Sequence, residues 1–193
     1  MKKTIFLAFI ASFICWHASA QTLPKVEMET SFGEIIIEID TVNAPITSIN
    51  FLNHVEKGNF MEAIFYRVVR MDNQPGNDIK IEVIQGGLFD DKKIEKIETI
   101  RHETTKETGL KHLNGTISMA RMDPGTASTE FFICVGEQPD LDYGGNRNSD
   151  EQGFAAFGQV VKGMDVVRKI QKAEDNNQYL TEPVSIQTIA IIK

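Results

Sequence analysis

The sequence is poor in cysteine, tryptophan and positive charge. It has two cysteines and one tryptophan among 193 residues, and 20 Lys and Arg against 27 Asp and Glu. A chain with this acidic balance lacks the basic face that binding to nucleic acid requires. It also lacks an apolar run of about 18 residues, so no membrane-spanning helix is expected in the mature chain.

The first 20 residues have the pattern of a cleaved secretory signal peptide. Met1-Lys2-Lys3 is basic, residues 4–16 are mostly apolar, and Ala18-Ser19-Ala20 is a small-residue cleavage site. We therefore expect residues 1–20 to be removed and residues 21–193 to form one domain. Cleavage would leave 18 basic and 27 acidic residues, a net charge of −9.

Cleavage would also leave Cys134 as the one cysteine of the mature chain. No internal disulfide can then form, and a lone thiol in an oxidising compartment is a liability unless it is buried. The apolar neighbours of Cys134 predict that it is buried and unreactive.

Hydrophobic periodicity predicts a protein made mostly of strands with two separated helices. Alternation and β-branched residues mark the strands, and apolar residues at helical spacing mark the helices. The predicted strands are 25–30, 33–40, 64–69, 80–86, 115–120, 130–135, 154–161 and 184–192, and the predicted helices lie at 44–58 and after Gly163. This order excludes a regular βαβ wind and leaves either an antiparallel sandwich or a closed barrel.

Four short segments carry the strongest motif signal. They are Phe65-Tyr66-Arg67-Val68, Ile84-Gln85-Gly86-Gly87, the segment 115–121 and Glu130-Phe131-Phe132-Ile133. The first is unusual because an always-charged guanidinium in an apolar run is costly unless it has a partner or a function.

In this order and spacing, the four segments resemble the cyclophilins, which are peptidyl-prolyl cis-trans isomerases. The segments 154–158 and 160–166 are most similar to the secreted, periplasmic bacterial branch. The resemblance implies a mainly β fold, a closed eight-stranded antiparallel β-barrel capped by two α-helices. It also implies a rotamase that assists the folding of exported proteins in the periplasm of a Gram-negative bacterium.

Strand alternation predicts which side chains meet. Phe65, Arg67 and Val69 would share one face, and each neighbouring strand also offers one polar group beside apolar ones, as small binding pockets do. The resemblance implies that Arg67 is catalytic and that Gln85 orients it. The substrate-binding residues that it implies are Phe65, Tyr66, Val83, Ala120, Arg121, Glu130, Phe132, Leu141 and Phe154.

Several positions depart from the family pattern. Tyr66 stands where a histidine is usual, Glu130 replaces a glutamine, and residues 71–80 are additional. Residues 121 and 154 also differ from the usual asparagine and histidine. A carboxylate at position 130 could compete for the guanidinium donors of Arg67. We therefore keep two hypotheses open: an isomerase, and a slow proline-peptide-binding or chaperone module.

The expected partners are proline-containing peptides and unfolded exported proteins. Glu82, Glu130 and Asp140 predict a preference for peptides with a basic residue beside the proline. Asp140 also stands where cyclosporin-sensitive members have a tryptophan, so weak cyclosporin binding is expected. We expect a monomer with no cofactor, and no metal site, since the histidines lack a paired ligand spacing.

Overall fold

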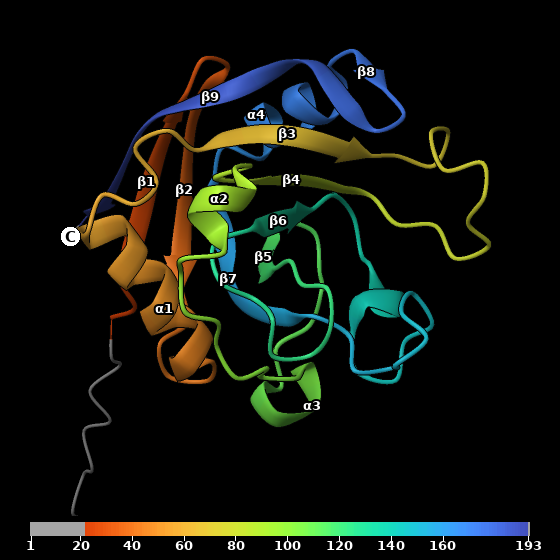
Figure 1. The fold of residues 1–193 in the computed structure, drawn as a ribbon, viewed down its shortest axis with the longest axis horizontal. Coiled ribbons are helices and arrows are strands. Elements are labelled where there is room, and N and C mark those ends of the chain that lie inside the picture. Colours follow the sequence, from red (N-terminus) through yellow and green to blue (C-terminus); the bar gives the residue numbers. More distant parts are fainter. Residues whose placement is uncertain (1–21, 193) are drawn as a thin grey trace, which may run out of the picture.

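A computed structural model of the protein describes residues 22–192 (Figure 1). The predicted signal peptide lies outside the described residues. The strands are β1 (Lys25–Thr30), β2 (Gly33–Ile39), β3 (Ile64–Val69), β4 (Val83–Gly87), β5 (Thr116–Met119), β6 (Phe131–Cys134), β7 (Ala155–Lys162), β8 (Asp175–Asn176) and β9 (Tyr179–Ile192). The helices are α1 (Pro45–Glu56), α2 (Asp91–Ile94), α3 (Thr105–Thr108), α4 (Met164–Gln171) and a 3-10 turn at Pro139–Leu141.

The strands form a closed antiparallel barrel. Eight of them follow the order β1-β2-β7-β5-β6-β4-β3-β9, and β1 pairs with β9 to close the circle. The short β8 pairs with β9 outside the barrel. The predicted eight-stranded barrel is confirmed, and the sandwich that the sequence left open is excluded.

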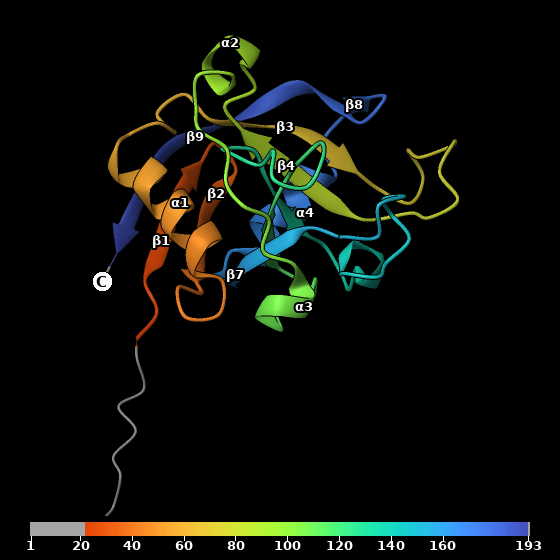
Figure 2. The ribbon, with the colours of Figure 1, turned by 60° about the horizontal axis from the view of Figure 1, so that its bottom comes forward.

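The two predicted helices are α1 and α4. Helix α1 packs against β7 and β9, and α4 packs against β2, β3 and β4 (Figures 1 and 2). Pro45 lies at the start of α1, where its missing N–H costs nothing. The connection from 91 to 111 contains the single-turn helices α2 and α3. No helix within residues 22–192 has the length and hydropathy to cross a membrane.

The barrel interior is filled by an apolar cluster with phenylalanines at its centre. The ring of Phe131 makes edge-on contacts with Phe51, Phe60 and Phe65 at centroid distances of 5.7, 6.0 and 5.8 Å. All four rings are buried. We call this set, with the strand residues packed around it, the interior cluster.

A second apolar cluster lies on the outer face of the same strands. It consists of Val69, Ile81, Val83, Phe132, Cys134 and Leu141, with Ala120 and Phe154 packed against it. Because side chains alternate along a strand, β6 gives Phe131 and Ile133 to the interior cluster, and Phe132 and Cys134 to the outer one. We call the second set the pocket cluster. Cys134 is buried within it, and burial raises the pKa of its thiol.

The strand predicted from residue 80 begins at Val83, and the last strand shows the largest error in the predicted bounds. We expected the last strand to start at residue 184, but β9 starts at Tyr179 and contains Pro183. In the pairing with β3, Val184 lies opposite Phe65 and Tyr179 opposite Arg67, so the residues between them bulge out of the ladder. A proline is tolerated at such a bulge because no ladder donor is needed there.

Candidate active site

A cavity of about 560 Å³ lies beside the pocket cluster. Every predicted site residue except Phe65 lines it. The lining is Tyr66, Arg67, Ile81, Val83, Gln85, Phe89, Asp91, Ile94, Ala120, Arg121, Met122, Thr126, Ser128, Glu130, Phe132, Leu141, Arg147, Asn148, Phe154 and Tyr179. The four motif segments, which are far apart in sequence, therefore converge on one site.

The prediction that Phe65 shares a face with Arg67 is wrong. The register of β3 against β4 shifts at this point: Phe65 pairs with Gly86, and Arg67 pairs with Gln85. Tyr66 is thus the extra residue of a β-bulge, which breaks the alternation of side chains. Phe65 turns into the interior cluster, while Tyr66 and Arg67 both face the cavity.

One side of the cavity is an apolar cup. Phe132 and Phe154 meet edge to face, with ring centroids 5.3 Å apart, and Val83 and Leu141 complete the wall. Phe132 is 5% exposed and Leu141 is fully buried, so both side chains of this wall are held by the packing around them. The cup is the place where an apolar ring of ligand would fit.

A buried polar group supports this cup from behind. The imidazole of His112 stacks on Phe132 at 5.9 Å, and its Nδ1 and Nε2 lie 2.8 Å from Asp142 Oδ1 and 3.0 Å from Ser118 Oγ. The order Ser-His-Asp is that of a hydrolase triad, but Ser118 is fully buried and does not line the cavity. Burial lowers the pKa of His112, so the imidazole stays neutral and holds Phe132 in place.

The guanidinium of Arg67 is held by two neutral side-chain oxygens. Its Nη1 donates to Gln85 Oε1 at 2.8 Å, while its Nε and Nη2 donate to Gln178 Oε1 at 3.1 and 2.6 Å. No carboxylate within residues 22–192 forms an ion pair with Arg67. Burial lowers the pKa of Arg67, yet an arginine remains protonated, so the cavity keeps an uncompensated positive charge.

The hydrogen bonds of Arg67 continue as a chain. Gln85 Nε2 donates to the Tyr66 hydroxyl at 2.7 Å, and that hydroxyl donates to Glu130 Oε2 at 2.7 Å. The other oxygen, Oε1, accepts from the backbone N–H of Leu88 at 2.8 Å. Burial raises the pKa of Glu130, and these donors oppose the shift. We call this chain the relay.

The relay overturns the expected competition between Glu130 and the ligand. The carboxylate of Glu130 does not reach the Arg67 donors, because Tyr66 and the Leu88 amide occupy it. It instead orients Gln85 and, through it, Arg67. The hypothesis of a slow binding module rested on a blocked Arg67, and that reason for it is removed.

Two backbone features at the end of β4 make the relay possible. A side chain at Gly87, whose φ is +146°, would overlap the Glu130 carboxylate, so only glycine fits. Phe89 follows with a φ of +49°, and its ring stacks on Tyr66 at a centroid distance of 4.2 Å. The Tyr66 ring is therefore held by stacking on Phe89, and its hydroxyl by two hydrogen bonds.

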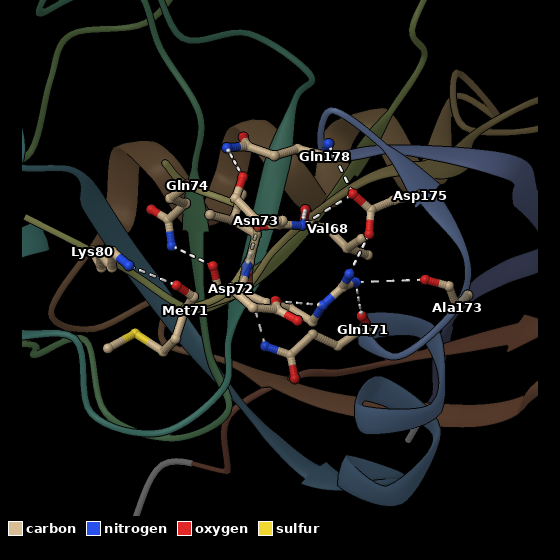
Figure 3. A network of polar contacts seen from close by, with 12 residues as sticks. Val68, Met71, Asp72, Asn73, Gln74, Lys80, Gln171, Ala173, Asp175 and Gln178 are labelled. Atoms are coloured by element: carbon tan, nitrogen blue, oxygen red, sulfur yellow. Dashed lines mark hydrogen bonds and ion pairs between the residues drawn. The ribbon is translucent and has the colours of Figure 1, made fainter. Parts of the chain in front are cut away.

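Gln178 is a site residue that the sequence did not reveal. It lies in the turn between β8 and β9, where both Asn177 and Gln178 have positive φ. Its Nε2 donates to the Asn73 carbonyl at 3.1 Å, and its backbone N–H donates to Asp175 Oδ2 at 2.9 Å (Figure 3). Asp175 is in turn ion-paired with Arg70. Asn73 belongs to the additional residues 71–80, which thus help to hold Arg67.

Arg121 lines the cavity but its charge is already paired. Its Nη1 and Nη2 donate to the two Asp150 oxygens at 2.8 and 2.9 Å, and its Nε and Nη2 donate to the Gly153 carbonyl. The guanidinium also lies over the Phe154 ring at 5.1 Å. Its role is to position Phe154 at the rim of the cup.

Comparison with known proteins supports the family resemblance that the sequence motifs indicate. Residues 25–191 match the family described as cyclophilin type peptidyl-prolyl cis-trans isomerase/CLD. A peptidyl-prolyl cis-trans isomerase of Acinetobacter baylyi is 34% identical over 193 residues, which are 100% of this chain and 94% of that protein. The peptidyl-prolyl cis-trans isomerase A of Dickeya dadantii is 34% identical, covering 91% of this chain and 88% of the relative.

The fold has a match among solved structures as well. A cyclophilin type isomerase of Cryptosporidium parvum superposes with a TM-score of 0.70 at 21% identity, covering 89% of this chain and 98% of that one. The same barrel fold is therefore found in a protein whose sequence identity to this chain is low. Taken with the matched residues and the bacterial relatives, this chain belongs to the cyclophilin-type peptidyl-prolyl cis-trans isomerase family.

Proposed function

We propose that Arg67 is the catalytic group of a prolyl isomerase that assists the folding of exported proteins. The observation that carries the proposal is the state of the guanidinium: it lies beside an apolar cup and is oriented by the amides of Gln85 and Gln178. A neutral acceptor fixes the direction of the donors without cancelling their charge. The charge is therefore free to act on a substrate.

The chemistry follows from the electronic structure of the X-Pro amide. Rotation has a barrier of about 18 to 20 kcal/mol because the nitrogen lone pair is delocalised in the planar states. In the twisted transition state the lone pair is localised on the prolyl nitrogen. A guanidinium N–H aimed at that nitrogen stabilises the twisted state more than either planar state, which is the condition for catalysis.

The apolar cup supplies the rest of the rate. A hydrogen bond from a charged donor contributes roughly 1.5–3 kcal/mol, and each tenfold in rate needs about 1.4 kcal/mol. Arg67 therefore accounts for about two powers of ten. Phe132, Leu141 and Phe154 would hold the proline ring and remove water from the amide, which favours the less polar twisted state.

The test is an isomerisation assay on purified residues 21–193 with a proline tetrapeptide. We expect catalysis well above the uncatalysed rate, which takes tens to hundreds of seconds. A folded protein that binds proline peptides without accelerating their isomerisation would instead support the slow binding module. A protein that neither binds nor isomerises would contradict both.

We also propose that the chain is exported to the periplasm with its mature form beginning at Gln21. The support is the leader of residues 1–20, with its basic start, apolar stretch and small-residue site. Intact-mass measurement of the protein from a periplasmic fraction tests this. Retention of Met1 to Ala20 in that fraction would contradict it.

A further inference from the structure

A second guanidinium, that of Arg147, lines the same cavity as Arg67. Arg147 is half-buried and lies in the segment between Leu141 and Phe154, two residues of the apolar cup. Its position in the sequence therefore places it close to the cup. The sequence analysis did not single it out.

Neutral oxygens of the additional residues 71–80 hold Arg147. Its Nη1 donates to the Ile79 carbonyl at 2.5 Å and to Gln74 Oε1 at 3.3 Å. Gln74 is fully buried and donates through Nε2 to the carbonyls of Arg70 and Ile81. The acceptor that meets Arg147 is thus itself fixed, and Arg147 is oriented without being neutralised.

The charges of the cavity do not balance. Of the two acids that line it, Glu130 is hydrogen-bonded within the relay, and Asp91 lies in the exposed helix α2. Among its bases, Arg121 is paired with Asp150. Within residues 22–192, neither Arg67 nor Arg147 is in an ion pair.

The two unpaired guanidiniums also act on each other. Burial lowers the pKa of Arg147, and the positive charge of Arg67 lowers it further. Two like charges at one half-buried site are unfavourable, and an anion between them would relieve the repulsion. A guanidinium matches a carboxylate well, because its planar N–H groups bond both oxygens.

Only one of the three acids that the sequence predicted near the proline, Glu130, lines the cavity. Glu82 and Asp140 are absent from its lining, and Asp140 lies at the surface, where its Oδ1 accepts from the backbone N–H of Asn146. Two of the three acids behind the expected preference for basic peptides therefore do not face the cavity. Glu130 apart, the cavity-lining charges without an ion-pair partner within residues 22–192 are the guanidiniums of Arg67 and Arg147 and the exposed carboxylate of Asp91.

We propose that Arg147 is a specificity-determining residue that binds the carboxylate of an acidic residue next to the substrate proline. The proposal rests on the proposed function of the cavity. With the proline ring in the cup, the preceding residue has its Cα about 3.8 Å from that of the proline in the trans isomer and about 2.9 Å in the cis isomer. Its side chain then starts beside the cup, in the cavity that both guanidiniums line.

The experiment compares three tetrapeptides that carry Glu, Gln or Lys immediately before the proline. Cis-trans exchange is measured by NMR, because this readout needs no coupling protease with its own charge preference. For the natural protein we expect kcat/KM to fall in the order Glu, Gln, Lys, with about two- to fivefold between Glu and Gln, as for partly exposed ion pairs. Added salt should reduce the difference.

Arg147→Gln should reduce the Glu-to-Gln ratio to near one while the neutral peptide keeps its rate. Arg147→Lys should keep part of the ratio, since it retains the charge and loses the planar donors. The matched control is Lys80→Gln, which removes an exposed cation of the neighbouring loop and should leave the ratio unchanged.

Each outcome separates this proposal from the proposed function. An unchanged ratio in Arg147→Gln, or an equal loss on the acidic and neutral peptides, would overturn the proposal, the latter showing that Arg147 only braces the loop. An equal effect of Lys80→Gln would show that the preference comes from overall charge and would overturn it too. Failure to isomerise any of the three peptides would instead contradict the function of the cavity.

Discussion

The interior cluster and the pocket cluster are built from alternate residues of the same strands, but they are completed differently. Phe131 in the interior meets three other phenylalanine rings, whereas its neighbour Phe132 meets Phe154 and the imidazole of His112. The contacts of Phe131 in the interior cluster are with other phenylalanine rings. The pocket cluster leaves an open side and depends on polar groups behind it, so stability and function are assigned to opposite faces of one sheet.

The strongest test of this division is a pair of adjacent substitutions. Phe131→Ala should lower the free energy of unfolding by about 3–5 kcal/mol, as expected for a buried aromatic, and leave kcat/KM of the folded fraction nearly unchanged. Phe132→Ala should cost less stability and raise KM. Urea unfolding and the isomerisation assay check both. Equal losses of kcat/KM in the two variants would contradict the division.

Arg67→Ala should affect function alone. We expect kcat/KM to fall about a hundredfold or more, because one charged donor is lost from the transition state. The free energy of unfolding should not fall, since a half-buried charge is removed from an apolar setting. Circular dichroism and the assay measure the two effects, and Arg67→Lys is the control that keeps the charge. Near-normal turnover in folded Arg67→Ala would exclude it from catalysis.

The relay predicts that Glu130→Gln lowers turnover, although the family pattern favours glutamine there. Glu130 accepts from Tyr66 with one oxygen and from the Leu88 amide with the other, and an amide has a single acceptor oxygen. We expect kcat to fall about tenfold, worth about 1.4 kcal/mol, with KM nearly unchanged, and Tyr66→Phe to behave similarly.

The control for this variant is Glu82→Gln, which changes an acid that does not line the cavity and should retain normal kcat. The competition for Arg67 expected from the sequence would instead give equal or higher turnover for Glu130→Gln. If that result is found, Glu130 restrains Arg67 instead of orienting it, and the relay has no catalytic role.

The polar group behind Phe132 predicts a pH dependence of stability. Burial lowers the pKa of His112 below its usual 6.5, as it does for His54 and His102. As the pH falls through the pKa that such a histidine has in the unfolded chain, the unfolded chain binds a proton that the folded chain binds less readily. Each such histidine therefore lowers the free energy of unfolding as the pH falls.

His112→Gln should reduce the slope of the unfolding free energy against pH, because one of the three histidines that cause this slope is removed. Urea midpoints at several pH values give the slopes for the natural and variant proteins. An unchanged slope would show that His112 is protonated in the folded protein as readily as in the unfolded chain.

The smallest expected effect belongs to Gln178. Gln178→Ala removes one of the two acceptors of Arg67. We expect kcat to fall about threefold, a smaller effect than the full free energy of one hydrogen bond to a charged group would give, because Gln85 still accepts from the guanidinium. The Arg67 Nε–H resonance should broaden, which a purely structural role would not produce. Asn176→Ala, an exposed change in the same hairpin, should alter neither. A sharp Arg67 resonance and normal kcat in Gln178→Ala would remove its positioning role.

The sequence predicted the barrel and most of the cavity because both depend on regular strand alternation. Val83 with Gln85, and Glu130 with Phe132, lie two residues apart and face the cavity together. Phe65 was misplaced because a bulge adds one residue to β3, and the apolar run around it carries no sign of a bulge. The family motifs supplied Leu141 and Phe154, which lie outside regular strands or at their ends.

The partners of the charged residues could not be predicted in the same way. Gln178 reaches Arg67, and Arg147 reaches the cavity, from a turn and a loop distant in sequence from Arg67, and neither belongs to a motif. Glu130 was placed correctly, but its bond to Tyr66 depends on a backbone conformation at Gly87 that composition does not reveal. Sequence patterns give the face on which a side chain lies, not the atom to which it bonds.

The pairing of β1 with β9 sets the order of events when this chain folds. Lys25 lies opposite Ile192, so the first and last strands form one ladder. Such a contact spans nearly the whole chain and carries the largest loop-closure entropy, which makes its formation slow. A ribosome that still holds the last residues keeps the barrel open. The chain therefore completes its fold only when its C-terminal strand is released.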